Sequence, residues 1–342
     1  MSNRAPAVQA RDLTKTYPGG VTALRGMDLT VESGTVFGLL GPNGAGKSTT
    51  VKILTTLARP DSGTATVAGH DVLDHPDRVR RAIGVVAQKS GADPVATGRE
   101  NLRLQARLHG LRGAPLRERV DALLDRFRLT DAADRQVRGY SGGMLRRLDV
   151  ALGLVHRPEV LFLDEPTTGL DPEARAAMWD EIARLAGEEG LTVLLTTHHL
   201  EEADRLAAHI AVVDRGRVVV QGTPHALKGE LRGDAVHMEL REPVGEAGRT
   251  LLSGALTALP GVYEAFFDGR RVSVRAEDGA AAVPALLAAL ERAGAGVASA
   301  TVARPSLDDV YLRYVGRRYA EAEAEAAATD GTAGLTLAGG AR

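Results

Sequence analysis

The chain of 342 residues is 44% hydrophobic and 25% charged, and its net charge of −2 gives no basic excess that would favour nucleic acid as a partner. Because it contains no cysteine, disulfides and thiolate metal sites are excluded, and a reducing compartment fits. The first residues lack the apolar core of a signal peptide, and the longest apolar run, at 280–290, contains a proline and is far shorter than the roughly 20 residues that span a bilayer. We therefore expect a soluble chain whose association with a membrane comes through a partner.

The part of the chain from about Val8 to Leu231 alternates short apolar runs with longer helical patterns, which predicts an α/β fold. Nearly continuous apolar runs are typical of strands that are buried on both faces of a parallel sheet. The predicted strands of this kind span 35–42, 82–88, 160–166, 192–198 and 209–214. The predicted helices span 48–57, 116–127, 143–155 and 172–186. Residues 8–33 and 212–224 have instead the pattern of antiparallel meanders with glycine turns.

After about Arg232 the pattern changes to strand, helix, strand, strand, helix, strand, which is the order of a small ferredoxin-like α+β domain. A last helix is predicted at 305–318, with Ser306 as its N-cap and acidic residues in its first turn. Residues 319–342 are rich in alanine and glutamate and predict a disordered, solvated tail. The expected organisation is a first domain at 8–231, a second at 236–318, and the tail.

A glycine-rich segment follows the first predicted core strand and precedes a predicted helix. It matches the pattern G-x-x-x-x-G-K-S/T of a phosphate loop, in which backbone N–H groups and the helix N-terminus face phosphate oxygens. Lys47 then reaches the β- and γ-phosphates of a nucleotide, and the Ser48 hydroxyl is placed to bind Mg²⁺. A glycine-rich turn without function is the alternative, and the full match in this context argues against it. The loop consists of Gly41, Pro42, Asn43, Gly44, Ala45, Gly46, Lys47, Ser48 and Thr49.

Two acidic residues, Asp164 and Glu165, end the apolar run at 160–166. At a strand end beside the phosphate loop, Asp164 can act as a partner of Mg²⁺. Glu165 can accept a proton from an attacking water, because a carboxylate within hydrogen-bond reach serves as a general base. The alternative is an aspartate that only caps the next helix, but a phosphate loop upstream requires such an acid, which favours the functional interpretation.

Three further positions stay open when only the residues themselves are considered. His198 ends the run at 192–198, at the edge of the sheet where ligands bind, and its imidazole can contact a γ-phosphate oxygen; His199 competes for this role. Gln88 follows another core strand and can equally be a surface amide. Tyr17 precedes the phosphate loop and either packs in the core or in a turn, or stacks on adenine.

A second glycine-rich segment, Ser141-Gly142-Gly143, opens a predicted amphipathic helix far downstream of the phosphate loop. Its glycines leave the backbone N–H groups of a helix N-terminus open, and Ser141 adds a hydroxyl. The segment therefore has the properties of a second anion site.

Together these motifs resemble the nucleotide-binding subunit of an ATP-binding cassette (ABC) transporter over residues 8–231. The resemblance implies that ATP and Mg²⁺ are the ligands and that a helical lobe lies at about 92–155. It also implies roles in nucleotide binding and hydrolysis. These are the adenine-stacking Tyr17, the Walker A loop Gly41–Thr49 with Lys47, the Q-loop Gln88 near Mg²⁺ and the attacking water, the Walker B acid Asp164, the catalytic Glu165 and the switch His198.

The segment YSGGM, Tyr140–Met144, resembles the signature of this family, usually written LSGGQ, and GLD, Gly169–Asp171, is similar to its D-loop. The resemblance implies that two copies of the chain sandwich two ATP molecules, each between the Walker A loop of one copy and residues 141–143 of the other. Tyr140 and Met144 depart from the usual leucine and glutamine, and the methionine thioether cannot replace the hydrogen bonds of an amide. The retained serine and glycines predict that the ATP sandwich is kept.

The stretches 97–102, 196–204 and 305–312 resemble the ATPases of drug exporters of the daunorubicin-resistance type. This resemblance implies a homodimer that pairs with a separate multi-helix membrane permease at the cytoplasmic face of the membrane. The expected function is ATP-driven efflux of a small hydrophobic compound of antibiotic type, which the permease mainly contacts. ABC ATPases that act on DNA or the ribosome usually carry a coiled-coil insertion or a second cassette, and neither is present, so no nucleic-acid partner is expected. The second domain either clamps the dimer, which we favour, or senses or gates.

Overall fold

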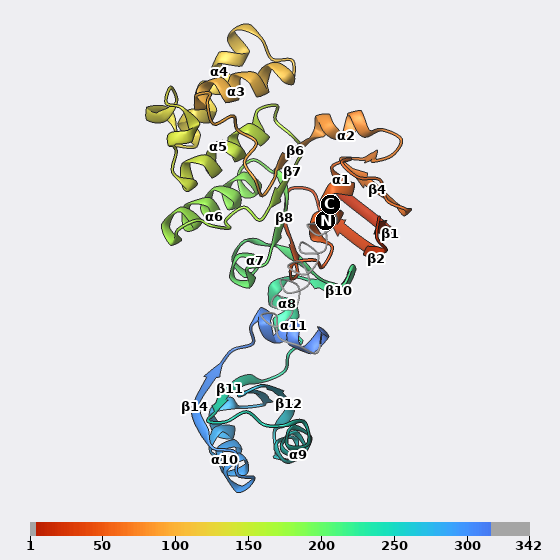
Figure 1. Cartoon of the computed structure of the whole chain (residues 1–342), viewed down its shortest axis with the longest axis vertical. Coiled ribbons are helices and arrows are strands. Elements are labelled where there is room, and N and C mark those ends of the chain that lie inside the picture. The colour runs from red at the N-terminus through yellow and green to blue at the C-terminus, as the bar shows by residue number, and fades with distance from the viewer. Residues whose placement is uncertain (1–4, 316–342) are drawn as a thin grey trace, which may run out of the picture. The chain divides into compact units, whose positions relative to one another are not determined.

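The computed structural model describes residues 5–315, apart from the side chains of residues 246 and 247. The predicted tail at 319–342 and the end of the last predicted helix lie outside the described residues. The chain divides into two compact units, of which the first ends at Thr223 and the second begins at Pro224 (Figure 1). No helix in the described part of the chain is both long and apolar enough to cross a membrane.

A six-stranded sheet forms the centre of the first unit, with the strand order β10-β9-β3-β8-β7-β6. All neighbouring strands pair in parallel except β10, which pairs antiparallel with β9 at the edge. Every residue of β3 and β8 is buried, which explains the continuous apolar runs and confirms the predicted parallel core. The strands are β3 (Val36–Leu40), β6 (Ile83–Val86), β7 (Val160–Asp164), β8 (Thr192–Thr197), β9 (His209–Asp214) and β10 (Arg217–Gly222).

Parallel register brings the carboxyl ends of these strands to one edge of the sheet. Leu40 at the end of β3 pairs with Thr197 of β8, and Thr196 of β8 pairs with Asp164 at the end of β7. Val86 at the end of β6 pairs with Leu163 of β7. The segments that follow the four strands therefore start side by side, and ligands of open α/β sheets bind at this edge.

A second, antiparallel sheet packs on the first unit's core, in the order β2-β1-β4-β5. Its strands are β1 (Val8–Tyr17), β2 (Val21–Val31), β4 (Ser62–Val67) and β5 (His70–Asp71). The meander of β1 and β2 was predicted, whereas β4 and β5, which lie beyond the phosphate loop in sequence, were not. Side chains of this sheet such as Leu13 and Leu24 share one hydrophobic core with Phe37 and Phe162 of the central sheet.

The helices of the first unit cover the central sheet and form a lobe beside it. In Figure 1 the lobe helices α3, α4 and α5 lie on one side of the central strands, and the antiparallel sheet lies on the other. The start of α3 is held by a capping box in which Thr97 and Glu100 bond each other's backbone N–H groups. The predicted helices are present with ends shifted by up to three residues, and α2 and α3 are additional. The helices are α1 (Lys47–Leu54), α2 (Pro76–Ala82), α3 (Gly98–Leu108), α4 (Gly113–Arg126), α5 (Gly142–Leu154), α6 (Pro172–Gly187) and α7 (Leu200–Leu206).

The second unit has the predicted ferredoxin-like order, and its antiparallel sheet runs β12-β13-β11-β14. Helices α9 and α10 pack on the apolar face of this sheet. Its elements are α8 (Pro224–Gly229), β11 (Asp234–Leu240), α9 (Glu246–Thr257), β12 (Val262–Asp268), β13 (Arg271–Ala276), α10 (Gly279–Arg292), β14 (Val297–Ala303) and α11 (Leu307–Val315).

The last helix, α11, begins at the predicted Ser306 cap. The Asp309 N–H donates to Ser306 Oγ at 3.2 Å, and Asp309 Oδ2 accepts from the Ser306 N–H at 2.9 Å, which is a reciprocal capping box. Helix α8 packs against α11, and the Tyr314 hydroxyl donates to Glu230 at 2.6 Å. These contacts place α8 in the second unit, so the division between units falls earlier in the chain than residue 231.

Candidate active site

The phosphate loop connects β3 to α1 and is held open by glycines that have no room for a side chain. A Cβ on Gly41 would lie 2.4 Å from the Val213 carbonyl oxygen, and Gly46, which precedes α1, has a φ of +111°. The Lys47 side chain is only 5% exposed. Its Nζ donates to the carbonyl oxygens of Gly41 at 2.5 Å and Pro42 at 3.1 Å. The lysine is thus held over a loop whose amides and helix N-terminus favour an anion.

The turn between β9 and β10 supports this loop from outside. The Gly216 N–H donates to the Ala45 carbonyl at 2.8 Å, and the Gly216 carbonyl accepts from the Arg25 N–H at 2.9 Å. Gly216 has a φ of +80°, and a Cβ there would lie 2.6 Å from the Ala23 carbonyl oxygen. The sequence predicts this turn only as part of an antiparallel meander, because its contact with the phosphate loop is set by tertiary packing.

Asp164 and Glu165 at the end of β7 are both bonded to Thr196 on the neighbouring strand β8. The Thr196 hydroxyl donates to Asp164 Oδ1 at 2.5 Å. The Glu165 N–H donates to the carbonyl oxygen and to Oγ1 of Thr196, each at 3.1 Å. Glu165 has a φ of +48°, in the left-handed region that non-glycine residues adopt only at a cost. Strand β7 thus ends at Asp164, and the chain turns at Glu165.

The Glu165 carboxylate lies among polar groups from two other segments and from its own, and its side chain is 10% exposed. His198 Nδ1 lies 3.1 Å from Glu165 Oε1. Gln88 Nε2 donates to Glu165 Oε2 at 3.1 Å, and the Thr168 hydroxyl donates to the same oxygen at 3.3 Å. These contacts bring together the residues that follow β6, β7 and β8. A carboxylate held in this way can accept a proton from a water.

Charges around Glu165 keep it ionised in spite of its burial. The interaction with the His198 imidazole is the largest cause that lowers the pKa of the Glu165 carboxyl, and the Lys47 ammonium lowers it further. Burial opposes both effects by raising it. The net direction is a pKa below the ordinary value of a glutamate, so Glu165 is in its carboxylate form at neutral pH.

The two adjacent histidines have different surroundings. His198 contacts Glu165, whereas His199 stands at the N-cap position of α7 and its N–H donates to Thr197 Oγ1 at 2.9 Å. The two rings lie 4.0 Å apart between centroids. Of the two, His198 is therefore the one next to the base.

Other predicted site residues lie at the ends of elements. Tyr17 ends β1 and is half-buried, with the Lys15 ammonium 5.7 Å from its ring centroid. Asp171 is the N-cap of α6, where its Oδ1 accepts from the Ala174 N–H at 2.8 Å. The structure gives no direct contact of Tyr17 or Asp171 with the group around Glu165.

The segment 141–143 lies at the start of α5 in the helical lobe. Ser141 is exposed and caps the helix, since its Oγ accepts from the Met144 N–H at 3.3 Å. Gly142 is exposed, and Gly143 packs against α6, where an added Cβ would lie 3.1 Å from the Ala174 Cβ. The helix N-terminus therefore faces solvent with its hydroxyl and first amides.

The two unusual residues of this segment have structural partners in the lobe. The Tyr140 hydroxyl donates to the Ala132 carbonyl at 2.7 Å, and it lies where a side chain on Gly98 would clash, at 2.3 Å. Met144 Sδ accepts from Arg135 Nη2 at 3.7 Å. The tyrosine and the methionine thus anchor the helix start to the lobe.

One buried residue of this site was missed by sequence analysis. Arg146, on α5, is only 8% exposed and donates three hydrogen bonds to backbone carbonyl oxygens. The sequence shows it only as one of two adjacent arginines in an amphipathic helix. No local signal distinguishes a buried arginine of this kind from its half-buried neighbour Arg147.

Mg²⁺ would have only oxygen ligands here. No group of three or more His, Cys, Asp or Glu side chains with metal-binding geometry occurs among the described residues. Mg²⁺ is usually held by one or two carboxylates together with phosphate oxygens and water, so a single aspartate suffices. The Asp164 carboxylate, the Ser48 hydroxyl and the Gln88 amide oxygen are hard oxygen donors that fit this ion, while the Gln88 amide nitrogen is bonded to Glu165.

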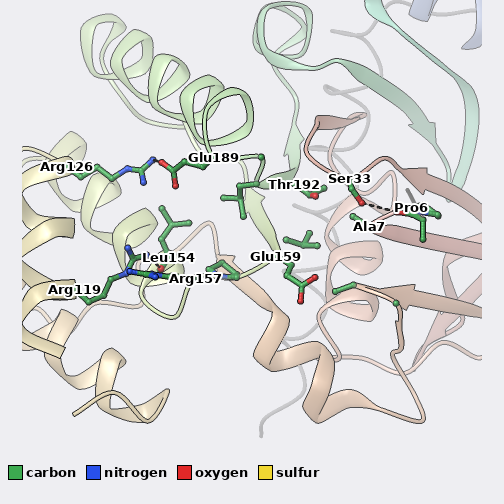
Figure 2. Close-up of a pocket in the computed structure, with 17 residues that line it drawn as sticks. Pro6, Ala7, Ser33, Arg119, Arg126, Leu154, Arg157, Glu159, Glu189 and Thr192 are labelled. Atoms are coloured by element: carbon green, nitrogen blue, oxygen red, sulfur yellow. Dashed lines mark hydrogen bonds and ion pairs between the residues drawn. The ribbon is translucent and has the colours of Figure 1, made fainter. Parts of the chain in front are cut away.

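A cavity of about 790 Å³ lies at the opposite edge of the sheet, where β7 and β8 begin (Figure 2). Arg119 Nε donates to the Val155 carbonyl at 3.0 Å at the end of α5. Arg126 pairs with Glu181 at 2.9 Å and with Glu189. These arginines join α4 to α5 and α6, which gives the cavity wall a structural role away from the phosphate loop.

Two family models match separate parts of the chain, one in each of its two units. A family model described as "ABC transporter" matches residues 24–168, and one described as "ATP-binding protein DrrA1-3-like, C-terminal domain" matches residues 222–315. The chain is 49% identical over 318 residues to the daunorubicin resistance ATP-binding protein DrrA3 of Streptomyces coeruleorubidus, covering 92% of this chain and 98% of the relative. It is 45% identical over 331 residues to the daunorubicin/doxorubicin resistance ATP-binding protein DrrA of Streptomyces peucetius, covering 95% and 97%.

Two solved structures resemble the first unit. One is cbiO1 from Clostridium perfringens, described as part of an ABC transporter complex, with a TM-score of 0.61 and 28% identity over 66% of this chain and 92% of that chain. The other is the ATP-binding cassette MJ0796 in a dimeric post-hydrolysis state bound to ADP and Pi, with a TM-score of 0.59 and 27% identity over 63% of this chain and 98% of that chain.

The contact of Gly216 with the phosphate loop gives a first prediction. Gly216→Ala should weaken ATP binding about tenfold, because strain of roughly 1–3 kcal/mol at a residue with positive φ and a backbone clash would push the turn off the loop. Gly69→Ala is the matched control: it has a similar φ of +74°, but no atom lies within 4 Å of its Cβ. Titration with a fluorescent ATP analogue measures both, and equal losses in the two variants would contradict the proposed contact.

The surroundings of Glu165 predict a change in the pH profile of hydrolysis. His198→Ala removes the largest cause that lowers the pKa of Glu165, so this pKa rises and the acid limb of the residual ATPase rate moves to higher pH. Thr168→Ala, which removes a weaker bond to the same carboxylate, should move the limb less. Single-turnover rates measured across the acid range test this order. An unchanged limb in His198→Ala would show that His198 does not set the ionisation of the base.

Proposed function

Because the chain belongs to the daunorubicin-resistance family of ABC transporter ATP-binding proteins, we propose that it hydrolyses ATP to drive export of a small hydrophobic compound, of antibiotic type, through a separate membrane permease. The observation that carries this proposal is the buried, ionised Glu165 carboxylate, which His198 and Gln88 contact at the same sheet edge as the phosphate loop. The names of the relatives refer to resistance to daunorubicin and doxorubicin, which supports an exported compound of antibiotic type.

Each residue of the edge has a distinct task in this proposal. The amides of Gly41–Thr49 and the Lys47 ammonium hold the β- and γ-phosphates, and Tyr17 stacks on the adenine. Asp164, Ser48 and Gln88 hold Mg²⁺, which when bound neutralises charge on the phosphates. Glu165 accepts a proton from the water that attacks the γ-phosphate.

His198 and Gln88 orient the base and the water. The imidazole of His198 lowers the pKa of Glu165, and in this proposal it also contacts a γ-phosphate oxygen. Gln88 donates to the other carboxylate oxygen and lies just after the end of β6. Binding or loss of the γ-phosphate would therefore move the segment that follows this strand.

The exposed start of α5 is proposed to complete the site of a second copy. Ser141, Gly142 and Gly143 present a hydroxyl and a helix N-terminus to solvent, and Asp171 begins the neighbouring helix α6. Such a half-site can bind the γ-phosphate of an ATP that is held by the phosphate loop of its partner. The dimeric state of the similar cassette MJ0796 supports this arrangement.

The permease is proposed to dock in a groove along the edge strand β6, which would hold the chain at the cytoplasmic face of the membrane. A pocket of about 270 Å³ lies between the lobe and the edge strand β6, and the strongly exposed Leu57 and Leu108 lie in and beside it. The stacked rings of His109 and His156, 3.7 Å apart, line it. Burial lowers the pKa of both rings, that of His156 to about 4, so the two histidines stay uncharged at neutral pH and Arg80 is the charged residue of the lining.

Replacing the base tests the proposed chemistry. Glu165→Gln should lower the rate of ATP hydrolysis by about 10²–10⁴-fold, because the amide cannot accept the proton, while ATP affinity stays within about threefold. Its ATP-bound dimer should persist and be detected by size-exclusion chromatography. Glu173→Gln, at an exposed position of α6, is the control and should hydrolyse normally. A normal rate in Glu165→Gln would show that another group is the base.

A charge in the groove tests the docking surface. Leu108→Glu should reduce co-purification of a multi-helix membrane protein from detergent-solubilised native membranes at least tenfold, because burying an unpaired carboxylate is costly. Leu251→Glu on α9 is the matched control, since the two leucines are 73% and 70% exposed. Equal recovery with both variants would place the permease elsewhere on the chain.

A further inference from the structure

We propose that Arg146 is a positioning residue that holds the catalytic turn around Glu165 and ties it to the start of α5. The inference rests on the proposed role of Glu165 as general base. It adds a residue that fixes the position of the backbone on which Glu165 lies.

Arg146 donates hydrogen bonds to the backbone on both sides of the proposed base. Its Nη2 donates to the Asp164 carbonyl at 2.9 Å and its Nε donates to the Pro166 carbonyl at 2.8 Å. These two carbonyls belong to the residues immediately before and after Glu165. The third bond, from Nη1 to the Ala87 carbonyl at 2.6 Å, fixes the residue that precedes Gln88. One planar guanidinium thus sets the spacing of the two segments whose side chains meet at Glu165 Oε2.

The conformation of Glu165 explains why such a clamp is needed. Its φ of +48° is costly for a residue with a side chain, and the proline that follows restricts it further. Strained residues persist when the surrounding structure determines their conformation several times over. The bonds that the Glu165 N–H donates to Thr196 fix the middle of this turn, and Arg146 fixes the carbonyls on both sides. Without the arginine, the turn could relax and move the carboxylate away from the attacking water.

A second contact of the same helix holds the chain on the other side of Gln88. Asp149, one turn after Arg146 and 7% exposed, accepts from the Ser90 hydroxyl at 2.7 Å. Helix α5 is therefore hydrogen-bonded to the Gln88 segment at residues 87 and 90. The N-cap of the same helix is Ser141. A partner's ATP that pulls on the start of α5 would act on Gln88 and Glu165 through this rigid element.

The neighbouring arginine provides a matched control. Arg147 is half-buried on the same helix, but it donates to the carbonyls of Gly143 at 3.3 Å and Phe127 at 3.1 Å, within the lobe. Lysine keeps the charge of either residue, yet it cannot span several carbonyls in the planar fork of a guanidinium. Arg146→Lys and Arg147→Lys therefore make the same chemical change on one helix, but only the first removes bonds to the turn around Glu165.

The experiment measures single-turnover ATP hydrolysis and ATP affinity for the full chain. Arg146→Lys should lower kcat about 10–100-fold, since a misplacement near 1 Å costs about that much, while the Kd for ATP stays within about threefold because the phosphate loop is untouched. Arg147→Lys should stay within about threefold of wild type in both. A loss of kcat and affinity together, equal in the two variants, would indicate a merely structural role and overturn the proposal.

A double substitution tests whether Arg146 acts through Glu165. In the Glu165→Gln background, Arg146→Lys should change the residual rate by less than about twofold, because the base it positions is already absent. A further fall as large as that in wild type would overturn the proposal. Should Arg146→Lys fail to fold, Ser90→Ala decides: it should lower kcat at least threefold with unchanged ATP affinity, and an unchanged kcat would refute the grip of α5 on the Gln88 segment.

The two proposals fail separately. If Glu165→Gln hydrolyses ATP at the wild-type rate, the assignment of the base is wrong. If Glu165→Gln is inactive but Arg146→Lys hydrolyses normally, only the positioning role is refuted.

Discussion

Parallel pairing of β3, β8, β7 and β6 is the constraint on which the candidate site depends, because it brings four strand ends to one edge of the sheet. Each strand delivers a different group there: the phosphate loop after β3, His198 after β8, Glu165 after β7 and Gln88 after β6. None of these segments is long, so a shift of register by one residue would separate the side chains that now lie within about hydrogen-bond distance. The rest of the first unit supports that edge through the hydrophobic cores on the two faces of the sheet.

Opposing forces act on Glu165, and the surrounding groups decide the result. Burial favours the neutral acid, whereas His198 and Lys47 favour the carboxylate and lower the pKa of this group. Its left-handed backbone is unfavourable by itself, and the bonds to Thr196 and the clamp of Arg146 on the neighbouring carbonyls oppose its relaxation. Residues from several elements thus keep the proposed base ionised and fix its position. Its side chain therefore needs little rearrangement when a water binds.

Helix α5 links two functions that are far apart in the chain. Its first residues, from Ser141, are exposed and form the proposed anion site, and its buried middle contacts the segments of Gln88 and Glu165 through Arg146 and Asp149. In the dimer that we propose, the first part serves the ATP of the partner and the second part serves the ATP of its own chain. A helix is rigid over this length, so the two sites need no flexible connection. The departures at Tyr140 and Met144 affect the attachment of this helix to the lobe, where both side chains have partners.

Local sequence determined the parts of this protein whose physics is local. The phosphate loop needs glycines beside a strand and a helix, the core strands need continuous apolar runs, and the α11 cap needs Ser306 followed by Asp309, so each could be predicted from adjacent residues. Strands β4 and β5 and helix α2 were not predicted, because β4 pairs with the distant strand β1, β5 is only two residues long, and α2 is brief and exposed at several positions. Tertiary structure alone decided that His198 contacts Glu165, that Gly216 supports the phosphate loop, and that Arg146 and not Arg147 reaches the catalytic turn. Each of these contacts depends on which face of a helix or strand packs against its neighbour. Two adjacent residues of the same type point to different faces, and only the folded chain decides which face meets the site.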